Sequence, residues 1–288
     1  MSIAATLLAG FRAAAPIQNA SPARTNSKLP IAESDTKAVR AKIRKDCPDW
    51  MALFHELSLV TGWRTNDVCA LTFDNIDFNT GRAEIIVQKQ SKAAQSRAFS
   101  KFIESQRAAR KATAMTAGDF QEYMRLDAAT RDDLAAELTQ EQIEQAAAAV
   151  QAAKLKTDSK TLPDHLIAKL RNLRERNHFD VFIFSRRLCA SNRARGQEGH
   201  ITRQSVWRWY SAVFEALKDT IQNASRLSSY STRKTFACAI LRAAGGDVAT
   251  VMAMFGHSSI QMSLRYLGLD DAGERAHKTM VSQMELAA

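Results

Sequence analysis

The spacing of apolar residues along the chain predicts a mostly helical protein. In the segment 48–59, Trp50, Leu53 and Leu57 recur at intervals of three and four residues, which places them on one face of an amphipathic helix. Gly62 follows as the residue that ends this helix. A helical pattern also begins near residue 35, and further helices are predicted at about 65–71, 96–154, 164–174, 205–221, 232–244, 248–254, 260–266 and 271–286.

Two short segments have the character of β-strands. Residues 83–88 contain the run Glu84-Ile85-Ile86-Val87, and they come directly after the turn sequence Asn79-Thr80-Gly81. Residues 157–162 form a second candidate strand. We therefore expect a fold that is mostly α with a small antiparallel β-sheet, of the α+β class.

The segment between these strands has a different composition from the rest of the chain. It is rich in alanine, glutamine, glutamate and arginine, and its apolar stripe is thin, with Leu134, Leu138, Ile143 and Val150. Because alanine has the highest helix propensity, we expect a helical acidic insert at about 93–156. Residues 1–34 have no helical period and predict a flexible N-terminal arm, which leaves residues 35–288 as one domain.

The net positive charge of the chain indicates a polyanionic binding partner. The 288 residues carry a net charge of +10. Between Ala117 and Ala152, eight acidic residues oppose two arginines, so this segment carries −6 and the remainder +16. This distribution favours a nucleic acid as the partner. The basic part of the chain would face the nucleic acid, and the acidic segment would point away from it. No stretch approaches the roughly 20 apolar residues of a membrane span, and the four widely spaced cysteines suit a reducing cytoplasm without a metal site.

Four separated motifs carry side chains that suit chemistry at a phosphate. They are Thr61-Gly62-Trp63-Arg64, Tyr230-Ser231-Thr232-Arg233, Gly256-His257-Ser258-Ser259 and Tyr266. Arginine stays charged and grips two phosphate oxygens at once, and a histidine N–H stabilises charge that develops at phosphorus. Tyrosine can form a covalent, reversible link to phosphate. Together these side chains can hold and attack a phosphodiester without a metal ion.

In this order, the motifs resemble the catalytic constellation of the tyrosine recombinase (phage integrase) family. Gly256-His257-Ser258-Ser259-Ile260 is similar to the family's Leu-Gly-His-Ser-Ser-Ile string, and Tyr266 follows at the family's interval. The resemblance implies a catalytic domain at 35–288 in which Tyr266 attacks DNA and forms a 3′-phosphotyrosine. It also implies that Arg64, Arg233 and His257 stabilise the pentacoordinate state, and that no cofactor is needed.

Tyr230 is the main departure from the family pattern. The family commonly has His-x-x-Arg followed by His-Thr-Phe-Ala, whereas this chain has Tyr230-Ser231-Thr232-Arg233 followed by Lys234-Thr235-Phe236-Ala237. A phenol is neutral near pH 7, so Tyr230 can donate a hydrogen bond to a phosphate oxygen but is a poor proton shuttle. The alternative is that Tyr230 is a buried aromatic cap on the helix that follows.

The family's general acid is a lysine at the tip of a β-hairpin, which protonates the leaving 5′-oxygen. Residues 87–92 are expected to end the first strand, so Lys89 and Lys92 are the candidates here. Spacing favours Lys89, and the local Gln-Ser-Lys string favours Lys92. Lys156, on the other side of the insert, is a third candidate.

Basic residues gather between Ser185 and Arg208, with Trp207 and Trp209 interleaved. Arginine and lysine side chains at this density are typical of a groove that binds the DNA backbone. The candidates for such contacts are Lys92, Arg186, Arg187, Arg193 and Arg203.

We therefore expect a site-specific DNA recombinase that acts on double-stranded DNA as a homotetramer, for example in the integration of a mobile element. Family members usually carry a helical clamp domain before the first arginine motif, and this chain has few residues there. The insert or an accessory DNA-binding protein is expected to take its place. The alternative is a catalytically reduced DNA-binding regulator or replicon-maintenance protein on the same fold, which would form no covalent adduct.

Overall fold

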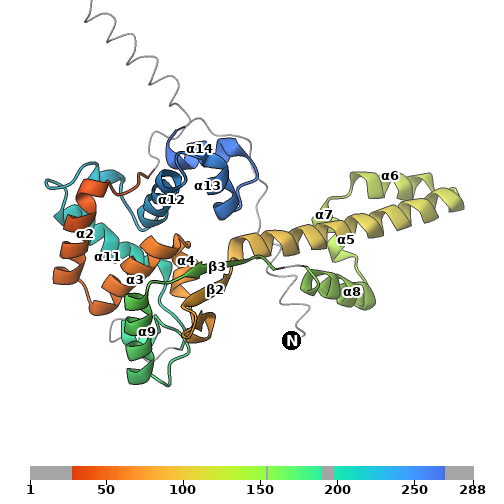
Figure 1. Cartoon of the computed structure of the whole chain (residues 1–288). Helices are drawn as coiled ribbons and strands as arrows, with labels where there is room; N and C mark the ends of the chain where they lie inside the picture. The colour runs from red at the N-terminus through yellow and green to blue at the C-terminus, as the bar shows by residue number, and fades with distance from the viewer. Residues whose placement is uncertain (1–27, 154, 190–197, 270–288) are drawn as a thin grey trace, which may run out of the picture. The chain divides into compact units, whose positions relative to one another are not determined.

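The structure is a computed structural model that describes residues 28–153, 155–189 and 198–269. The predicted helix at 271–286 and residues 1–27 of the predicted arm lie outside these ranges. The described chain is mostly helical, and its three strands form one sheet in the order β1-β2-β3, which confirms the expected fold class. Residues 86–158 form one compact unit, the insert unit, and the described residues of 23–85 and 159–288 form another, the main unit (Figure 1).

Four helices of the main unit pack around a common apolar core. They are α2 (Glu33–Asp46), α3 (Asp49–Thr61), α4 (Thr65–Cys69) and α11 (Arg203–Ala216). Phe54 of α3 and Phe184 are almost fully buried, and their rings meet edge to face with centroids 5.1 Å apart. The Thr202 side chain accepts a hydrogen bond from the backbone nitrogen of Ser205 and so caps α11.

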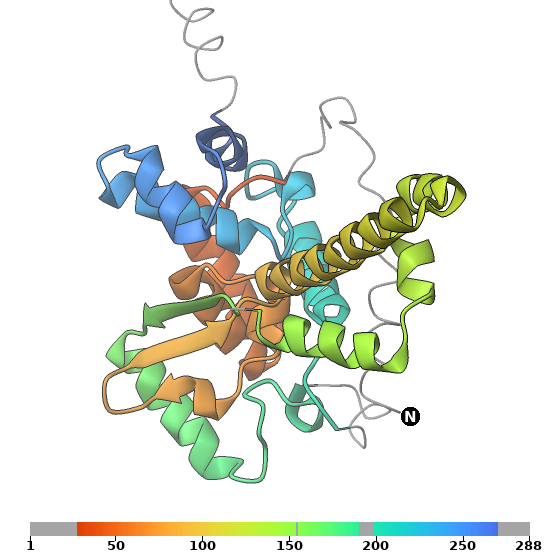
Figure 2. The ribbon, with the colours of Figure 1, turned by 90° about the vertical axis from the view of Figure 1, so that its right-hand side faces the viewer.

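The sheet is small and lies at the ends of the insert. Its strands are β1 (Ile76–Asp77), β2 (Arg82–Ile86) and β3 (Thr157–Thr161), and Figure 2 shows them side by side. β1 runs antiparallel to β2, with Ile76 opposite Ala83. The short helix η1 (Phe73–Asn75) precedes the sheet, and α9 (Asp164–Arg176) follows it. Both predicted strands are confirmed, although β2 ends two residues earlier than expected.

The C-terminal helices of the main unit enclose a second apolar cluster. These helices are α12 (Ser231–Ala243), α13 (Val248–Phe255) and α14 (Ile260–Leu267), and the short segments α10 (Arg186–Cys189) and η2 (Ala224–Arg226) come before them in the chain. Phe236, Ala237, Val251, Phe255 and Leu267 form the buried part of the cluster, which α12, α13 and α14 contribute together (Figure 1). On its other side α12 packs against α3. The second, third and fourth motifs of the sequence therefore lie on one group of helices.

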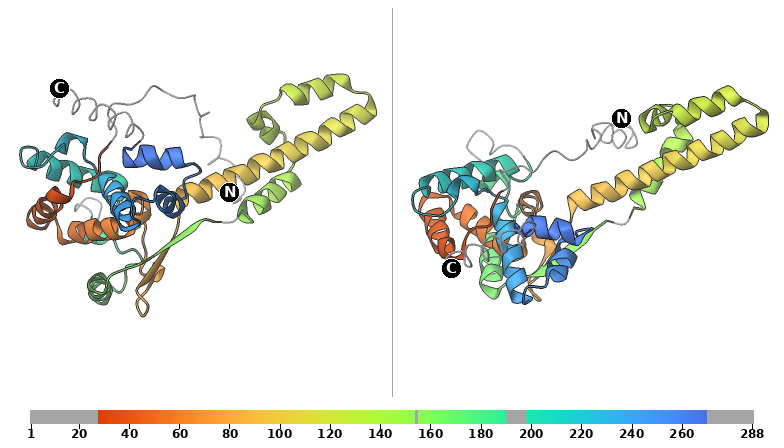
Figure 3. Two further views of the ribbon diagram at one scale, coloured as in Figure 1. Left: turned by 45° about the horizontal axis from the view of Figure 1, so that its top comes forward. Right: turned by 90° about the horizontal axis from the view of Figure 1, so that it is seen from above.

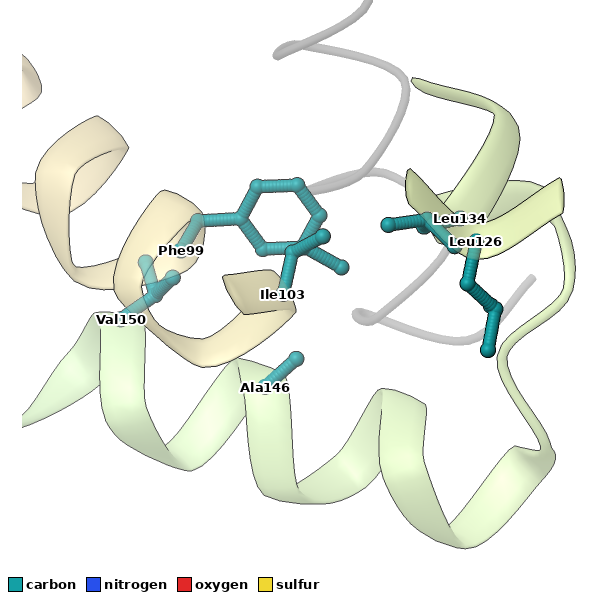
Figure 4. Packing of buried hydrophobic residues seen from close by; sticks show 6 residues of the cluster. All are labelled: Phe99, Ile103, Leu126, Leu134, Ala146 and Val150. Atoms are coloured by element: carbon teal, nitrogen blue, oxygen red, sulfur yellow. The ribbon is translucent and has the colours of Figure 1, made fainter. Parts of the chain in front are cut away.

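The insert unit is a helical bundle with its own core. It consists of α5 (Gln88–Ala117), α6 (Phe120–Ala128), α7 (Arg131–Ala136) and α8 (Gln140–Gln151). The three shorter helices pack against α5 (Figure 3). Phe99 and Ile103 of α5 meet buried side chains of the other helices, as Figure 4 shows. Leu134 and Val150 of the predicted stripe belong to this cluster.

Charged side chains also join the helices of the insert unit. Arg110 of α5 pairs with Glu122 and Glu137, at N–O distances of 2.9 and 2.7 Å. Arg125 of α6 pairs with the same two glutamates, both at 2.6 Å. The hydrogen bonds from Arg125 and Arg110 lower the pKa of Glu137 to about 2. The acidic residues of the insert therefore serve in part to hold its own helices together.

None of the described helices is both long and apolar enough to cross a bilayer. Within the described ranges, no group of three or more histidine, cysteine, aspartate or glutamate side chains is placed to hold a metal ion.

A buried polar pair connects α3 with α11 in the main unit. Nδ1 of His55 and the hydroxyl of Tyr210 share a hydrogen bond of 2.9 Å, and both side chains are almost fully buried. Burial lowers the pKa of His55 from its ordinary value of 6.5 to about 3. In mildly acidic solution, His55 is therefore neutral in the folded protein but protonated in the unfolded chain.

We expect the main unit to lose stability at this histidine as the pH falls. Below the unfolded pKa of about 6.5, the loss is about 1.4 kcal/mol per pH unit, continuing toward the folded value. Urea unfolding of the wild-type protein and His55→Gln, at about pH 7 and pH 5, measures it. All four tryptophans lie in the main unit, so their fluorescence reports on it. The wild-type free energy of unfolding should fall by about 2 kcal/mol more than that of the variant; parallel losses would contradict the expectation.

Candidate active site

Arg233 lies at the centre of the site, in the first turn of α12. Its side chain is buried, with the residue 7% exposed. Nη1 donates a hydrogen bond of 2.5 Å to the carbonyl oxygen of Gly62, and the guanidinium carbon lies 4.4 Å from the ring centroid of Phe255. Nε is buried and has no hydrogen-bond partner among the described residues. Burial lowers the pKa of Arg233, but an arginine remains charged in proteins.

Gly62 joins the first motif to the second. It ends α3 in the left-handed conformation, with φ +62°. A Cβ atom on Gly62 would lie 2.1 Å from Cδ1 of Phe236, closer than any real side chain tolerates. Only glycine therefore lets α3 and α12 approach closely enough for the carbonyl oxygen of Gly62 to receive Arg233.

Substitution of Gly62 by alanine is expected to cost more than the same change at Gly245. The two glycines have φ values of +62° and +61°, but a Cβ on Gly245 meets nothing within 4 Å. Gly245→Ala should therefore cost about 1–2 kcal/mol for the left-handed backbone alone. Gly62→Ala should cost an additional 1–3 kcal/mol or so for overpacking against Phe236. Urea unfolding followed by tryptophan fluorescence compares the free energies of unfolding of the two variants. Equal losses of stability would contradict the close approach of Gly62 to Phe236.

Tyr266 lies in the last turn of α14, within a cage of rings. Its ring centroid is 5.8 Å from that of Tyr230, 5.3 Å from that of Phe255 and 5.3 Å from that of His257. The hydroxyl is buried and makes no hydrogen bond of good geometry with the described residues. Burial raises the pKa of Tyr266, although the nearby charge of Arg233 opposes the increase. The resting side chain is therefore a neutral phenol.

His257 follows the end of α13 and is held by a buried serine. Its Nδ1 and the hydroxyl of Ser263 share a hydrogen bond of 2.9 Å, and Ser263 is fully buried. The half-buried ring has a lowered pKa, because burial and the charges of Arg233 and Arg64 disfavour the imidazolium form. The site therefore holds a fixed imidazole that is neutral near pH 7.

Arg64 and Tyr230 complete the predicted set in the main unit. Arg64 is half-buried at the N-terminus of α4, and its charge lowers the pKa of both Arg233 and His257. Asp67, one turn later on the same helix, is 5% exposed. Tyr230 is the first residue before α12 and remains 41% exposed. This exposure disagrees with the alternative of a buried aromatic cap.

The three candidate lysines belong to the insert unit, where all are exposed. The expectation that residues 87–92 end a strand is wrong. β2 ends at Ile86 and α5 begins at Gln88, so Lys89 and Lys92 lie in the first turns of a helix. The glutamines and lysines of this stretch, and the two alanines that follow it, favour helix. Pairing across the sheet stops at Val87, whose backbone nitrogen donates to the carbonyl of Lys156 over 2.7 Å.

The predicted DNA-contact arginines lie around the start of α11. Arg187 and Arg203 are exposed, whereas Arg186 is half-buried and its Nε donates to the carbonyl of His200 over 3.1 Å. Arg193 lies outside the described residues. Trp207 is 51% exposed on α11. A cationic and aromatic surface therefore accompanies the N-terminal half of α11.

Lys234 belongs to the same group of side chains, although the motifs did not single it out. The residue is 8% exposed, and its Nζ lies 5.5 Å from the ring centroid of Tyr266. It comes four residues after Tyr230, which places both on one face of α12. The sequence also places Lys234 directly after Arg233, where the family pattern commonly has a histidine.

Comparisons with known proteins identify a family. A sequence profile of the phage integrase family matches residues 35–272. No curated protein is similar enough in sequence to count as a relative.

Similar solved structures include three recombinases or integrases. The first is XerA recombinase, with 15% identity, a TM-score of 0.48, and coverage of 88% of this chain and 65% of that chain. The second is the Tn1549 transposon integrase in complex with a circular intermediate DNA, with 12% identity, a TM-score of 0.49, and coverage of 85% and 63%. The third is XerH bound to a palindromic difH substrate, with 11% identity, a TM-score of 0.49, and coverage of 90% and 54%. The chain thus spans less than two thirds of each.

Proposed function

Because the chain belongs to the phage integrase family, we propose that it is a site-specific DNA recombinase that cleaves and rejoins DNA through Tyr266. The observation that carries this proposal is the convergence of distant motifs on one buried phenol. Arg233 binds Gly62 of the first motif and contacts Phe255, whose ring also contacts Tyr266. Side chains of the second and third motifs thus surround the candidate nucleophile of the fourth, and the Gly62 carbonyl joins the first motif to them.

The charges in the site suit a phosphodiester. Arg233 is a buried cation with an unused Nε–H donor, and Arg64 is near enough to influence it. Buried cations of this kind bind phosphate oxygens strongly, because little water competes for their donors. We assign Arg64 and Arg233 to the non-bridging oxygens of the scissile phosphate. We assign the hydroxyl of Tyr230, a residue that is 41% exposed, to a further hydrogen bond with the same group.

His257 suits the charge that develops during the reaction. Its orientation is fixed by Ser263, and a fixed N–H donor stabilises a transition state without the cost of reorganisation. The lowered pKa of His257 means that the ring acts as a hydrogen-bond donor and not as a permanent cation. We assign it to the pentacoordinate phosphate.

The proposed step exchanges one phosphoester bond for another. The phenol oxygen of Tyr266 bonds to phosphorus and loses its proton, while the bond from phosphorus to the 5′-oxygen breaks and that oxygen takes a proton. The product is a 3′-phosphotyrosine and a free 5′-hydroxyl. Because the ester bond energy is kept, rejoining is the same step in reverse. The lysine that protonates the 5′-oxygen is one of Lys89, Lys92 and Lys156.

The proposed partners follow from this step. Exchange between two duplexes cuts four strands, so four copies of the chain act together on double-stranded DNA. Exposed cations near α11 and Lys92 supply backbone contacts, which depend on salt because they release counterions. The insert unit or an accessory DNA-binding protein supplies further contacts to the DNA.

A covalent trap tests the proposal. The wild-type protein is incubated with nicked, fragmented DNA from the host replicon and denatured in SDS. DNA that stays attached to the protein is sequenced, and the linkage is mapped by mass spectrometry. An adduct on Tyr266 is the expected result. Retained DNA binding without any adduct would favour the DNA-binding regulator instead.

A further inference from the structure

We propose that Lys234 is a positioning residue that activates Tyr266, by holding a positive charge beside the phenol as its proton leaves. The inference rests on the proposed function, because it takes Tyr266 as the nucleophile. It adds a residue that the motifs of the sequence do not assign, and it supplies a charge that Tyr230 lacks.

Burial is the first observation. Lys234 is 8% exposed, and lysine is among the residues least often buried in folded proteins. Withdrawing an ammonium group from water is unfavourable unless nearby groups compensate. The aromatic face of Tyr266, 5.5 Å from Nζ, is one such group, since ring faces attract cations. A phenolate at the same place would compensate the charge far better.

The position of Lys234 on α12 is the second observation. Tyr230 and Lys234 are one helical turn apart, and each contacts the ring of Tyr266. In the family pattern the residue at the position of Tyr230 is a histidine, which can carry a positive charge. A tyrosine cannot, so the nearest substitute on that face of the helix is the ammonium group of Lys234.

The third observation is the set of groups that face Tyr266. From α12 these are Tyr230, Arg233 and Lys234, and from the turn between α13 and α14 there is His257. His257 favours its neutral form. Arg233 already binds the carbonyl of Gly62 and, in the proposed function, a phosphate oxygen. Lys234 therefore adds a further positive charge beside Tyr266, on the helix that also carries Tyr230 and Arg233.

In the reaction Lys234 keeps its protons. The O–H bond of Tyr266 breaks as the bond from oxygen to phosphorus forms, and the proton passes to solvent water. The ammonium group stabilises the negative charge on the phenol oxygen during this transfer. In rejoining, the same charge makes the phenolate a better leaving group, so one residue serves both directions.

The test compares Lys234→Met with Lys234→Arg, which retains the positive charge. Single-turnover cleavage is measured between about pH 6 and pH 9, with a saturating concentration of DNA that contains the site recovered from the covalent trap. The methionine variant is expected to cleave at least about tenfold more slowly near pH 7, and its pH profile should move about one unit to higher pH. The arginine variant should keep the wild-type profile. Lys218→Met, which removes a lysine paired with Glu215 at 3.0 Å, is the matched control and should change neither.

A second readout needs no reaction. Phenolate absorbance is titrated in the DNA-free protein, and the contribution of Tyr266 is taken as the difference from Tyr266→Phe. It should begin at higher pH in Lys234→Met than in the wild-type protein or Lys234→Arg. Coincident wild-type and methionine curves in either experiment would overturn the inference, as would an arginine variant as impaired as the methionine variant. Absence of any wild-type adduct would instead count against the proposed function, and the titration would still decide the role of Lys234.

Discussion

Tyr266→Phe is expected to abolish the covalent DNA adduct while leaving the fold and DNA binding nearly intact. Phenylalanine keeps the ring that contacts Tyr230, Phe255 and His257 and removes only the hydroxyl. That hydroxyl is buried and makes no hydrogen bond of good geometry with the described residues. Burying an unpaired polar group costs about 1–3 kcal/mol, so the variant should be at least as stable as the wild-type protein.

Two measurements on the same preparation separate these effects. SDS-resistant adducts report on chemistry, and urea unfolding reports on stability. Tyr230→Phe is the matched control, because it also removes one tyrosine hydroxyl from the site but leaves the candidate nucleophile in place. It should form adducts, more slowly than the wild-type protein. Adduct formation by Tyr266→Phe would refute the assignment of the nucleophile. Strong destabilisation of Tyr266→Phe would show that the hydroxyl makes a stabilising hydrogen bond in the folded protein.

Arg233→Lys is expected to reduce the rate of cleavage by about 10²–10³-fold, the usual cost of removing a preorganised donor to a developing anion. Lysine keeps a positive charge but has no planar fork, so it cannot bind Gly62 and a phosphate oxygen at once. The loss should appear in single-turnover cleavage at saturating DNA. There it reflects the chemical step and not affinity.

Arg233 also has a structural role, and the experiment must separate the two. The variant loses the hydrogen bond to Gly62 and the stacking on Phe255, so some loss of stability is expected. Arg242→Lys is the matched control on α12. Arg242 is exposed and pairs with Glu33, so its replacement should leave cleavage unchanged. Equal cleavage by Arg233→Lys and the wild-type protein would remove Arg233 from the phosphate site.

The helices of the main unit were predictable because each has one buried face. The apolar period in α3 places Phe54 and Leu57 toward the core, and such a period is visible in the sequence alone. The start of α5 was not predictable in this way. Residues 87–92 have no apolar period, and the strand before them ends only where its pairing partner ends. The boundaries of the predicted arm, domain and insert stay predictions.

What the sequence by itself determined is the order of the motifs, the helical character of the chain and, through both, its family. Which side chains meet was decided only by the tertiary structure. The carbonyl of Gly62 receives Arg233, and Lys234 lies beside Tyr266, although neither pair is close in sequence. Periodicity shows which face of a helix is buried but not which helix it meets. The pKa values of Tyr266 and His257 likewise depend on burial and on the distance to Arg233, which lies far from both in the sequence.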